Sequence, residues 1–309
     1  MSVKTGIVVG SRGSRLAVIQ AQAVAARLKA AHPQMDISLC QIVTRGDRDS
    51  HVPLDRMEDI GVFVKELETA LREGRIDLAV HSLKDMPTVI PPELCLAAVT
   101  ERADPRDVLV SRGDTLAGLP AGARIGTGSL RRAVQLTSYR PDLEVVGIRG
   151  NVDTRLRRVA AGEVDGVILA AAALSRLGWG ARVSQYLPVD DFLPAVGQGA
   201  LALETRCGDE TVAGLVAAIN DIPTWQGITA ERAFLLALGG GCRAPIAALG
   251  TVIGNTLRLE GMAADPGGRQ MLRDADEGSA KSAEALGRRL ARKLLARGAD
   301  KFIAEVKQG

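Results

Sequence analysis

Aromatic residues, histidines and closely spaced cysteines are all scarce in this chain of 309 residues. Aromatic side chains make up 3% of the sequence, which leaves few rings on which nucleic-acid bases could stack. The three histidines are scattered and no two of the four cysteines form a C-x-x-C pair, so we expect no metal site. No apolar run approaches the roughly 20 residues that a membrane span needs. These absences argue against nucleic-acid-binding, metal-dependent and membrane proteins.

The start of the chain has no long apolar core and no small-residue cleavage site, so it does not resemble a secretory signal peptide. We therefore expect a cytoplasmic protein, in which a disulfide framework is uncommon. Cys40 and Cys95 occur in apolar, strand-like runs, and we expect both to be buried, unreactive thiols.

Arginine is abundant and unevenly distributed. The chain is 46% apolar and 24% charged, as in ordinary soluble proteins, and is long enough for two or three domains. It contains 31 Arg and 8 Lys for a net charge of +3, and residues 124–182 hold ten Arg against five acids. Arginine can grip carboxylates or phosphates with two parallel hydrogen bonds. The clustering therefore favours an anionic ligand.

One order of elements occurs twice in the sequence. In the first copy we expect strands over 6–9, 37–43 and 78–80 and helices over 15–31 and 63–72. In the second copy we expect strands ending at 125 and over 144–148 and 166–169, with helices over 130–139 and 152–161. A Gly-x-x-Asp segment precedes the last strand of both copies, at residues 74–77 and 162–165. Strands that alternate with helices predict two α/β lobes with largely parallel sheets, a central cleft, and ligand groups at the carboxyl ends of the strands.

The last part of the chain has a different pattern. We expect a helix over 228–238, strands over 247–252 and 256–262, and a final helix over 279–296. The predicted organisation is a first α/β lobe formed by residues 1–100 and 199–217, a second lobe over 105–195, and a small α+β domain over 222–309.

Both copies begin with a glycine- and serine-containing turn before a helix. Ser14 and Ser129 stand at the start of these helices, where each could be a simple N-cap. Helix N-termini also favour anions, and arginines flank both turns. Arg12 precedes the first helix, and Arg131 and Arg132 lie in the second. An anion-binding role is the stronger interpretation.

Lys84 and Asp85 closely follow the strand predicted over 78–80. Such a pair is often no more than a solvated ion pair on the surface. Its place at the carboxyl end of a strand favours a ligand site, where an aspartate could act as a general acid or base.

Cys242 follows three glycines and precedes Arg243. The glycines leave the sulfur accessible and the arginine could favour the thiolate, although an exposed bystander is an equal alternative. As a hydrolase nucleophile it lacks a convincing histidine partner. The charged segment 45–62 could be either a solvated loop or a lid.

Several motifs are distributed along nearly the whole chain: Val43-Thr44-Arg45-Gly46-Asp47, His81-Ser82-Leu83-Lys84-Asp85, Gly126-Thr127-Gly128-Ser129-Leu130-Arg131-Arg132, Arg149-Gly150-Asn151-Val152, Leu193-Pro194-Ala195-Val196-Gly197-Gln198-Gly199 and Gly240-Gly241-Cys242. Together they resemble the motifs of the porphobilinogen deaminase (hydroxymethylbilane synthase) family. The resemblance implies two lobes similar to periplasmic binding proteins, with the cysteine on a third domain.

The resemblance also implies a reaction. Four porphobilinogen units are joined head to tail, each with loss of ammonia, on a dipyrromethane cofactor bound to the cysteine by a thioether. The linear tetrapyrrole hydroxymethylbilane is then released. Every pyrrole carries an acetate and a propionate, so the cleft needs many cationic partners, in agreement with the arginine cluster.

Site residues follow from the same resemblance. It places the catalytic carboxylate at Asp85 and the cofactor thioether at Cys242. It implies that the cofactor is also bound by Lys84, Ser129, Arg131, Arg132, Gly150 and Gln198. It implies that the substrate is bound by Arg12, Ser14, Phe63, Ser82, Thr127, Arg149, Arg155 and Arg176. We expect no metal, no nucleic-acid or membrane partner, and a monomer.

Two departures and one rival hypothesis stand beside this resemblance. Glu58-Asp59-Ile60 replaces a common Gly-Gly-Lys, which would weaken the attraction of the 45–62 loop for an anionic product. Gly128 replaces a common serine and removes one possible donor. The rival is a non-catalytic, two-lobed binding protein for a polycarboxylate ligand, which predicts no role for Cys242 or Asp85.

Overall fold

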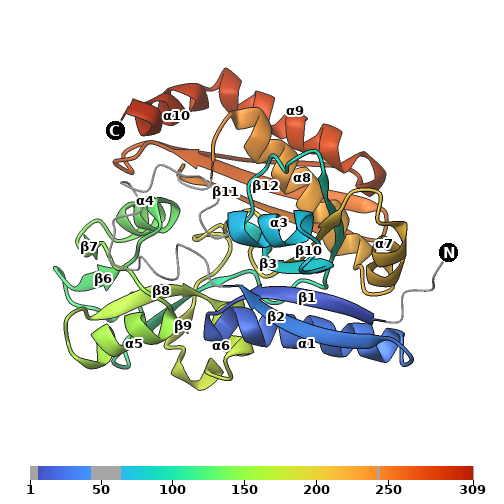
Figure 1. Ribbon diagram of the computed structural model, residues 1–309. Helices are drawn as coiled ribbons and strands as arrows, with labels where there is room; N and C mark the ends of the chain where they lie inside the picture. The colour runs from blue at the N-terminus through green and yellow to red at the C-terminus, as the bar shows by residue number, and fades with distance from the viewer. Residues whose placement is uncertain (1–5, 43–63, 242–243, 309) are drawn as a thin grey trace. The chain divides into compact units, whose positions relative to one another are not determined.

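The computed structural model describes residues 6–42, 64–241 and 244–308. These fall into two compact units, and Figure 1 labels their elements where there is room. Unit 1 comprises residues 1–102 and 200–225, and unit 2 comprises residues 103–199 and 226–309. Within the described residues, no helix is both long enough and apolar enough to cross a membrane.

A five-stranded sheet forms the centre of unit 1, with the strand order β2-β1-β3-β10-β4. Its strands are β1 (Gly6–Arg12), β2 (Asp36–Ile42), β3 (Leu78–Ser82), β4 (Leu94–Val99) and β10 (Leu201–Arg206). β1 pairs in parallel with β2 and β3, whereas β10 is antiparallel to β3 and β4. Strand β3 extends two residues beyond the predicted 78–80 and therefore includes His81 and Ser82.

Helices cover both faces of this sheet (Figure 1). The helices are α1 (Arg15–Ala31), α3 (Lys65–Arg72) and α7 (Glu210–Ala217). α1 and α7 pack on one face, where the fully buried Val9 and Leu203 belong to the core. α3 packs Leu67 and Leu71 on the opposite face. Alternate residues of each strand therefore contact different helices, because side chains alternate between the faces of a sheet.

Unit 2 begins with a second five-stranded sheet, ordered β7-β6-β8-β5-β9. Its strands are β5 (Asp107–Ser111), β6 (Arg124–Gly126), β7 (Glu144–Val146), β8 (Gly166–Ala170) and β9 (Gln185–Tyr186). The helices are α4 (Leu130–Tyr139), α5 (Val152–Ala160) and α6 (Ala171–Arg176). Leu136 of α4 packs in the core of one face, and Leu156 of α5 with Leu174 of α6 pack in the core of the other.

The two sheets confirm the duplication expected from the sequence. In each, three parallel strands are followed by an antiparallel fourth strand, which is β10 in unit 1 and β5 in unit 2. The repeated Gly-x-x-Asp turn has the same geometry in both. Asp77 accepts a hydrogen bond from Val8 N (2.9 Å), and Asp165 accepts one from Arg124 N (2.7 Å). Each aspartate thus ties the start of one parallel strand to its neighbour.

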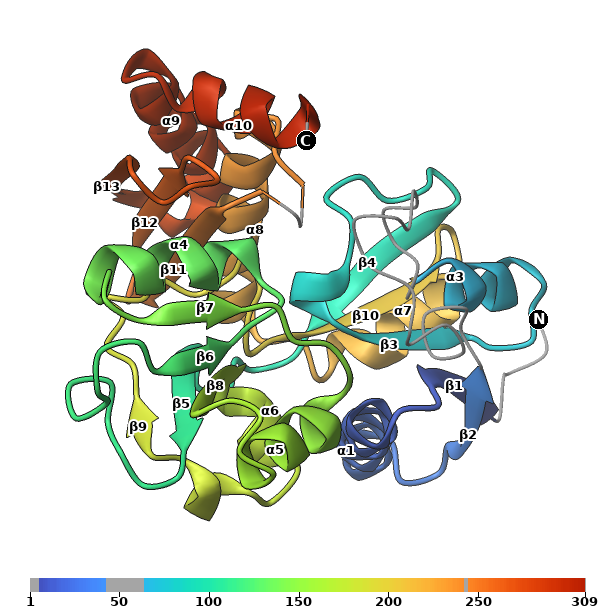
Figure 2. The same cartoon turned by 90° about the vertical axis from the view of Figure 1, so that its left-hand side faces the viewer.

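Unit 2 also contains a three-stranded antiparallel sheet, formed by β11 (Ile246–Ile253), β12 (Thr256–Ala264) and β13 (Met271–Ser279). Helices α8 (Ile222–Leu238) and α9 (Ala283–Ala296) bury Phe234 and Leu290 in one core with this sheet, and α10 (Ala299–Gln308) follows (Figure 2). The sequence analysis did not anticipate β13 or α10. Residues 226–309 and 103–199 belong to one compact unit, and the predicted division into three domains stays a prediction.

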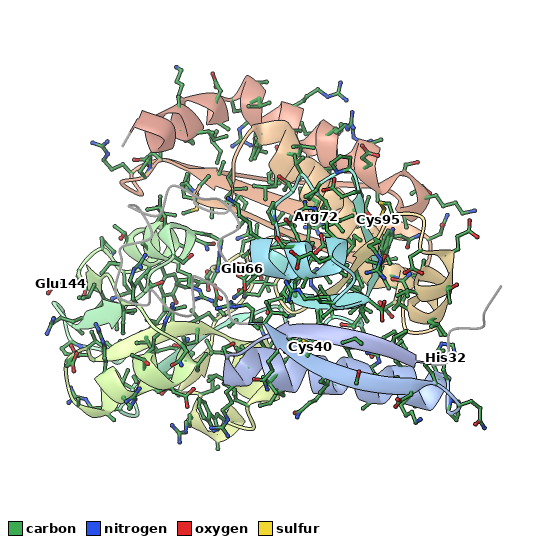
Figure 3. The ribbon with its side chains drawn as sticks, viewed as in Figure 1. His32, Cys40, Glu66, Arg72, Cys95 and Glu144 are labelled. Atoms are coloured by element: carbon green, nitrogen blue, oxygen red, sulfur yellow. A yellow bond between two sulfur atoms is a disulfide. The ribbon has the colours of Figure 1, made fainter. Side chains whose placement is uncertain are left out.

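The expectation of an inert Cys95 thiol and no disulfide was wrong. Cys95, labelled in Figure 3, forms a disulfide with Cys207, which lies 112 residues away in the sequence. Cys95 lies in β4 and Cys207 directly follows β10, and the pairing of these strands brings the two Cα atoms to 5.2 Å. This separation suits a disulfide. Cys40 is a half-buried free thiol in β2.

Candidate active site

Asp85 lies at the end of the 3₁₀ turn Leu83–Asp85, which continues directly from β3. The backbone N–H of Leu83 donates to the carbonyl of Ala200 (3.1 Å) and fixes the start of the turn. Leu83 is buried, Lys84 is half-buried and Asp85 is exposed. The turn therefore anchors itself with an apolar side chain and presents a carboxylate to solvent beyond the strand.

Three other predicted residues of unit 1 lie at the ends of β1 and β3. Arg12 is the last residue of β1 and is half-buried. Ser14 is the N-cap of α1, and its hydroxyl accepts a long hydrogen bond from Ala17 N (3.4 Å). Ser82 ends β3 and exchanges hydrogen bonds with the buried amide of Gln20 (3.0 and 3.2 Å). Ser14 is thus a helix N-cap, which is one of the two interpretations that the sequence allowed for it.

The corresponding turn of unit 2 differs in its capping. Ser129 precedes α4, but its side chain makes no capping hydrogen bond. The hydroxyl of Thr127 instead accepts from Ser129 N (3.2 Å). A Cβ atom added to Gly128 would lie 2.8 Å from the carbonyl oxygen of Ile148, so a serine here would require the backbone to shift. The Ser129 hydroxyl is therefore more available to a ligand than that of Ser14.

Arg131 and Arg132 share one buried carboxylate. Arg131 Nη1 donates to Asp107 Oδ2 (2.8 Å) and to the carbonyl of Leu193 (2.7 Å). Arg132 donates to Asp107 Oδ1 through Nη2 (2.7 Å) and Nε (3.1 Å), and to the carbonyl of Ile168 through Nη1 (3.1 Å). Both arginine residues are about 5% exposed. Their hydrogen bonds therefore stabilise the interior of unit 2.

Gln198 completes this cluster, since its Nε2 donates to Asp107 Oδ1 (2.9 Å) and to the carbonyl of Pro105 (2.7 Å). Burial alone would raise the pKa of Asp107, but the charges of Arg131 and Arg132 outweigh it and hold that pKa well below its ordinary value. The two arginines therefore favour the ionised form of Asp107. The roles of these arginines and of Gln198 toward the cofactor remain predictions.

The remaining predicted residues of unit 2 surround the start of α5 and the end of α6. Gly150 has φ +100°, and a Cβ there would lie 2.7 Å from the side chain of Thr154, so only glycine fits. Its carbonyl accepts from Arg155 Nε (2.8 Å). Arg149 is half-buried beside it. Arg176 donates to the carbonyl of Gly199 (2.6 Å), and burial lowers the pKa of its guanidinium.

Phe63, Cys242 and the 45–62 segment lie outside the described residues. Cys242 belongs to the connection between Leu238, the last residue of α8, and Ile246, the first of β11. Within the described part of the chain, no three His, Cys, Asp or Glu side chains gather as possible metal ligands.

Sequence reasoning missed three carboxylates that are fully buried: Asp107, Glu204 and Glu231. Glu231 of α8 accepts hydrogen bonds from the backbone N–H groups of Gly197 and Gly250, both at 2.8 Å. Glu204 contacts His81. Asp107 and Glu204 each border an apolar run in the sequence, and a charge at such a position was the signal that could have revealed them. Glu231 is followed by Arg232, and the sequence carries no comparable signal there.

The fold and these residues define a class: an α/β protein with a duplicated five-stranded sheet and basic side chains at strand ends and helix starts. Family models identify it further. One described as "Porphobilinogen deaminase, dipyromethane cofactor binding domain" matches residues 7–214, and one described as "Porphobilinogen deaminase, C-terminal domain" matches residues 225–296. The chain belongs to the porphobilinogen deaminase family.

Curated relatives agree with this assignment over nearly their full length. A porphobilinogen deaminase of Moorella thermoacetica is 53% identical over 302 residues, which cover 97% of this chain and 96% of the relative. One of Syntrophotalea carbinolica is 48% identical, covering 96% of this chain and 94% of the relative. The expected family, its enzymatic activity in tetrapyrrole biosynthesis and its dipyrromethane cofactor are therefore confirmed, and the non-catalytic alternative is not supported.

Solved structures show weaker likeness. The methionine-binding protein MetQ aligns with a TM-score of 0.46 and 14% identity, covering 77% of this chain and 97% of that one. The periplasmic VFT2 domain of Bordetella pertussis BvgS aligns with a TM-score of 0.42 and 19% identity, covering 70% of this chain and 87% of that domain. At these scores the likeness carries no conclusion about this chain.

Proposed function

We propose that this enzyme joins four porphobilinogen units on a dipyrromethane cofactor attached to Cys242 by a thioether, and that Asp85 is its catalytic carboxylate. The observation that supports Asp85 best is its exposure at the end of a turn that is otherwise anchored by buried Leu83. A carboxylate held there can accept hydrogen bonds from pyrrole N–H groups. It can also stabilise the positive charge that develops on the substrate as ammonia leaves.

The donors of the described residues suit a ligand rich in carboxylates. The Ser129 hydroxyl makes no capping bond, and Arg149, Arg155 and Lys84 are half-buried cations. When bound, the dipyrromethane supplies the pyrrole carbon to which the first substrate unit is joined. We assign Lys84, Ser129, Arg131, Arg132, Gly150 and Gln198 to the cofactor. We assign Arg12, Ser14, Phe63, Ser82, Thr127, Arg149, Arg155 and Arg176 to the substrate.

We also propose that the chain acts as a cytoplasmic monomer without a nucleic-acid or membrane partner. The low aromatic content supports the absence of nucleic-acid binding. The cytoplasm is reducing, so a cytoplasmic protein would keep Cys95 and Cys207 mainly as thiols. The redox state of this pair in freshly lysed cells therefore tests the proposed location.

The function is tested by intact mass and by turnover. The purified protein should exceed its sequence mass by two porphobilinogen units less two ammonia molecules, and Cys242→Ser should lack this increment. Asp85→Asn should keep the increment yet lose activity by about 10²- to 10⁴-fold. An unmodified native protein that also gains no mass with porphobilinogen would refute the cofactor attachment. Near-normal turnover of Asp85→Asn would remove Asp85 from the mechanism.

A further inference from the structure

His81 and Glu204 form a buried pair beside the proposed catalytic turn. The Nε2 atom of His81 lies 2.9 Å from Glu204 Oε2, and the two side chains are 3% and 0% exposed. Ala202 of β10 stands opposite His81 of β3, so Glu204 lies two residues further along on the same face. The pair therefore ties β3 to β10 across the face that α3 covers.

Burying an ionisable pair costs desolvation free energy that apolar side chains do not. An ionisable pair removed from water is often no more stable than apolar side chains of similar volume. Glu204 Oε1 is also buried without a hydrogen-bond partner among the described residues. Stability alone therefore gives no reason for the pair, and a role connected with the end of β3 is the better explanation.

A third titratable group faces the pair from α3. Glu68 is 7% exposed, and burial together with the negative charge of Glu204 raises the pKa of its carboxyl. The pKa of Glu68 is also affected by the charges of Arg72, Glu93 and His81. Arg72, labelled in Figure 3, forms an ion pair with Glu93. The charged groups around the pair thus come from α3, β10 and the residue before β4.

The end of β3 is held on all sides. His81 is bound to Glu204 on one face, and Ser82 is bound to Gln20 of α1 on the other. The next residue, Leu83, donates its backbone N–H to Ala200. Asp85 follows two residues later, at the end of the turn. Any rotation of β3 about its axis would therefore displace the Asp85 carboxylate.

We propose that His81 is a positioning residue, whose hydrogen bond to Glu204 fixes the end of β3 so that the turn presents Asp85 to the substrate. This inference rests on the proposed role of Asp85. It assigns to His81 no contact with substrate or cofactor.

The test compares three variants as cofactor-loaded enzymes, with loading checked by intact mass. His81→Leu removes the hydrogen bond, whereas His81→Gln can place an amide N–H near the Nε2 position and retain it. Glu204→Leu removes the acceptor and so breaks the same hydrogen bond from the other side. We expect His81→Leu to lower kcat by about 10²-fold, the usual effect of misplacing a reacting group by about 1 Å, with little change in KM. His81→Gln should restore most of the rate.

Val212→Ala is the matched control, because Val212 is fully buried in unit 1 but lies in α7, on the opposite face of the sheet. It should lower the unfolding temperature and leave kcat unchanged. If His81→Leu does not fold, Glu204→Leu replaces it, and a reduced kcat with little change in KM in the folded variant supports the proposal. Wild-type kcat in folded His81→Leu, or in folded Glu204→Leu when it takes that place, overturns it.

Asp85→Asn measured in parallel separates the two proposals. An active Asp85→Asn enzyme overturns both, since nothing would then need positioning. An inactive Asp85→Asn enzyme together with a fully active His81→Leu enzyme overturns the role of His81 alone.

Discussion

The two units bury a carboxylate on equivalent strands but neutralise it differently. Asp107 lies on β5 and Glu204 on β10, the antiparallel fourth strands of the two sheets, and both are 0% exposed. Asp107 uses both oxygens, which accept from two arginines. Glu204 has one described partner, His81, and one oxygen without any. Both carboxylate oxygens of Asp107 in unit 2 therefore accept hydrogen bonds, which makes its network saturated. In unit 1, one oxygen of Glu204 has no partner among the described residues, so its network is incomplete.

This difference affects how each unit responds to its surroundings. Arginine does not lose its proton in proteins, and the two arginines hold the pKa of Asp107 well below its ordinary value, so we expect the Asp107 network to keep its charges near neutral pH. The Glu204 cluster includes Glu68, whose carboxyl has a pKa raised by burial and by the charge of Glu204. Unit 1 also carries the Cys95–Cys207 disulfide, which depends on redox conditions. We therefore expect unit 1 to be sensitive to pH and reductant, and unit 2 to be insensitive.

The largest effect is expected from Asp107→Asn. It leaves the charges of Arg131 and Arg132 buried without a counter-ion, and breaking a buried ion pair in this way costs about 3–5 kcal/mol. Urea unfolding monitored by circular dichroism should show the loss. Asp142→Asn, which removes the exposed partner of Arg140, is the control and should change little. A stable Asp107→Asn protein would mean that the arginines find other partners and that the network is not saturated.

Breaking the disulfide should have the next largest effect. It closes a long loop, with 112 residues separating the two cysteines, and removal of a native disulfide commonly costs about 2–4 kcal/mol. The unfolding temperature should therefore fall when reductant is added or when Cys207 is changed to Ser. Cys40→Ser, which removes the free thiol, should respond to reductant as the wild type does. Equal unfolding temperatures with and without reductant, at verified thiol content, would contradict this expectation.

The smallest effect concerns pH. Burial raises the pKa of Glu68 above its unfolded value, so the folded state binds this proton more tightly. The resulting stability is full below the unfolded pKa and is lost as the pH rises through the folded pKa. Glu68→Gln, which cannot ionise, should therefore reduce the decline in stability between mildly acidic and neutral pH. The free energy of unfolding measured across this range checks it, and parallel curves for variant and wild type would exclude Glu68 as the cause.

Much of the fold could be predicted because its signals are local. The helix over 15–31 was predicted with its observed bounds, since it combines a serine N-cap, an apolar face and a proline just beyond its end. The repeated Gly-x-x-Asp segments predicted equivalent turns because glycine supplies the positive φ, 69° at Gly74 and 73° at Gly162. β13 was missed because its alternation of polar and apolar residues is weak, and its residues are mostly half-buried.

The candidate site was predictable only in part. Motif resemblance identified Asp85, and the structure places it at an exposed turn after a strand, as its position in the chain suggested. The same motifs marked Arg131 and Arg132 as ligand groups without revealing that Asp107 binds both. A motif records which residue types occur together, but it does not record how many of their donors are already used within the protein.

The sequence by itself determined the family, the duplicated order of strands and helices, and the positions of the capping and turn residues, because each depends on neighbours a few residues away. Only the tertiary structure decided which distant residues meet: Cys95 with Cys207, His81 with Glu204, and Asp107 with two arginines. These pairs depend on strand pairing and on which face of a sheet each side chain occupies. A shift of one residue in the pairing would turn the strand residues among them, such as His81, Glu204 and Asp107, to the other face.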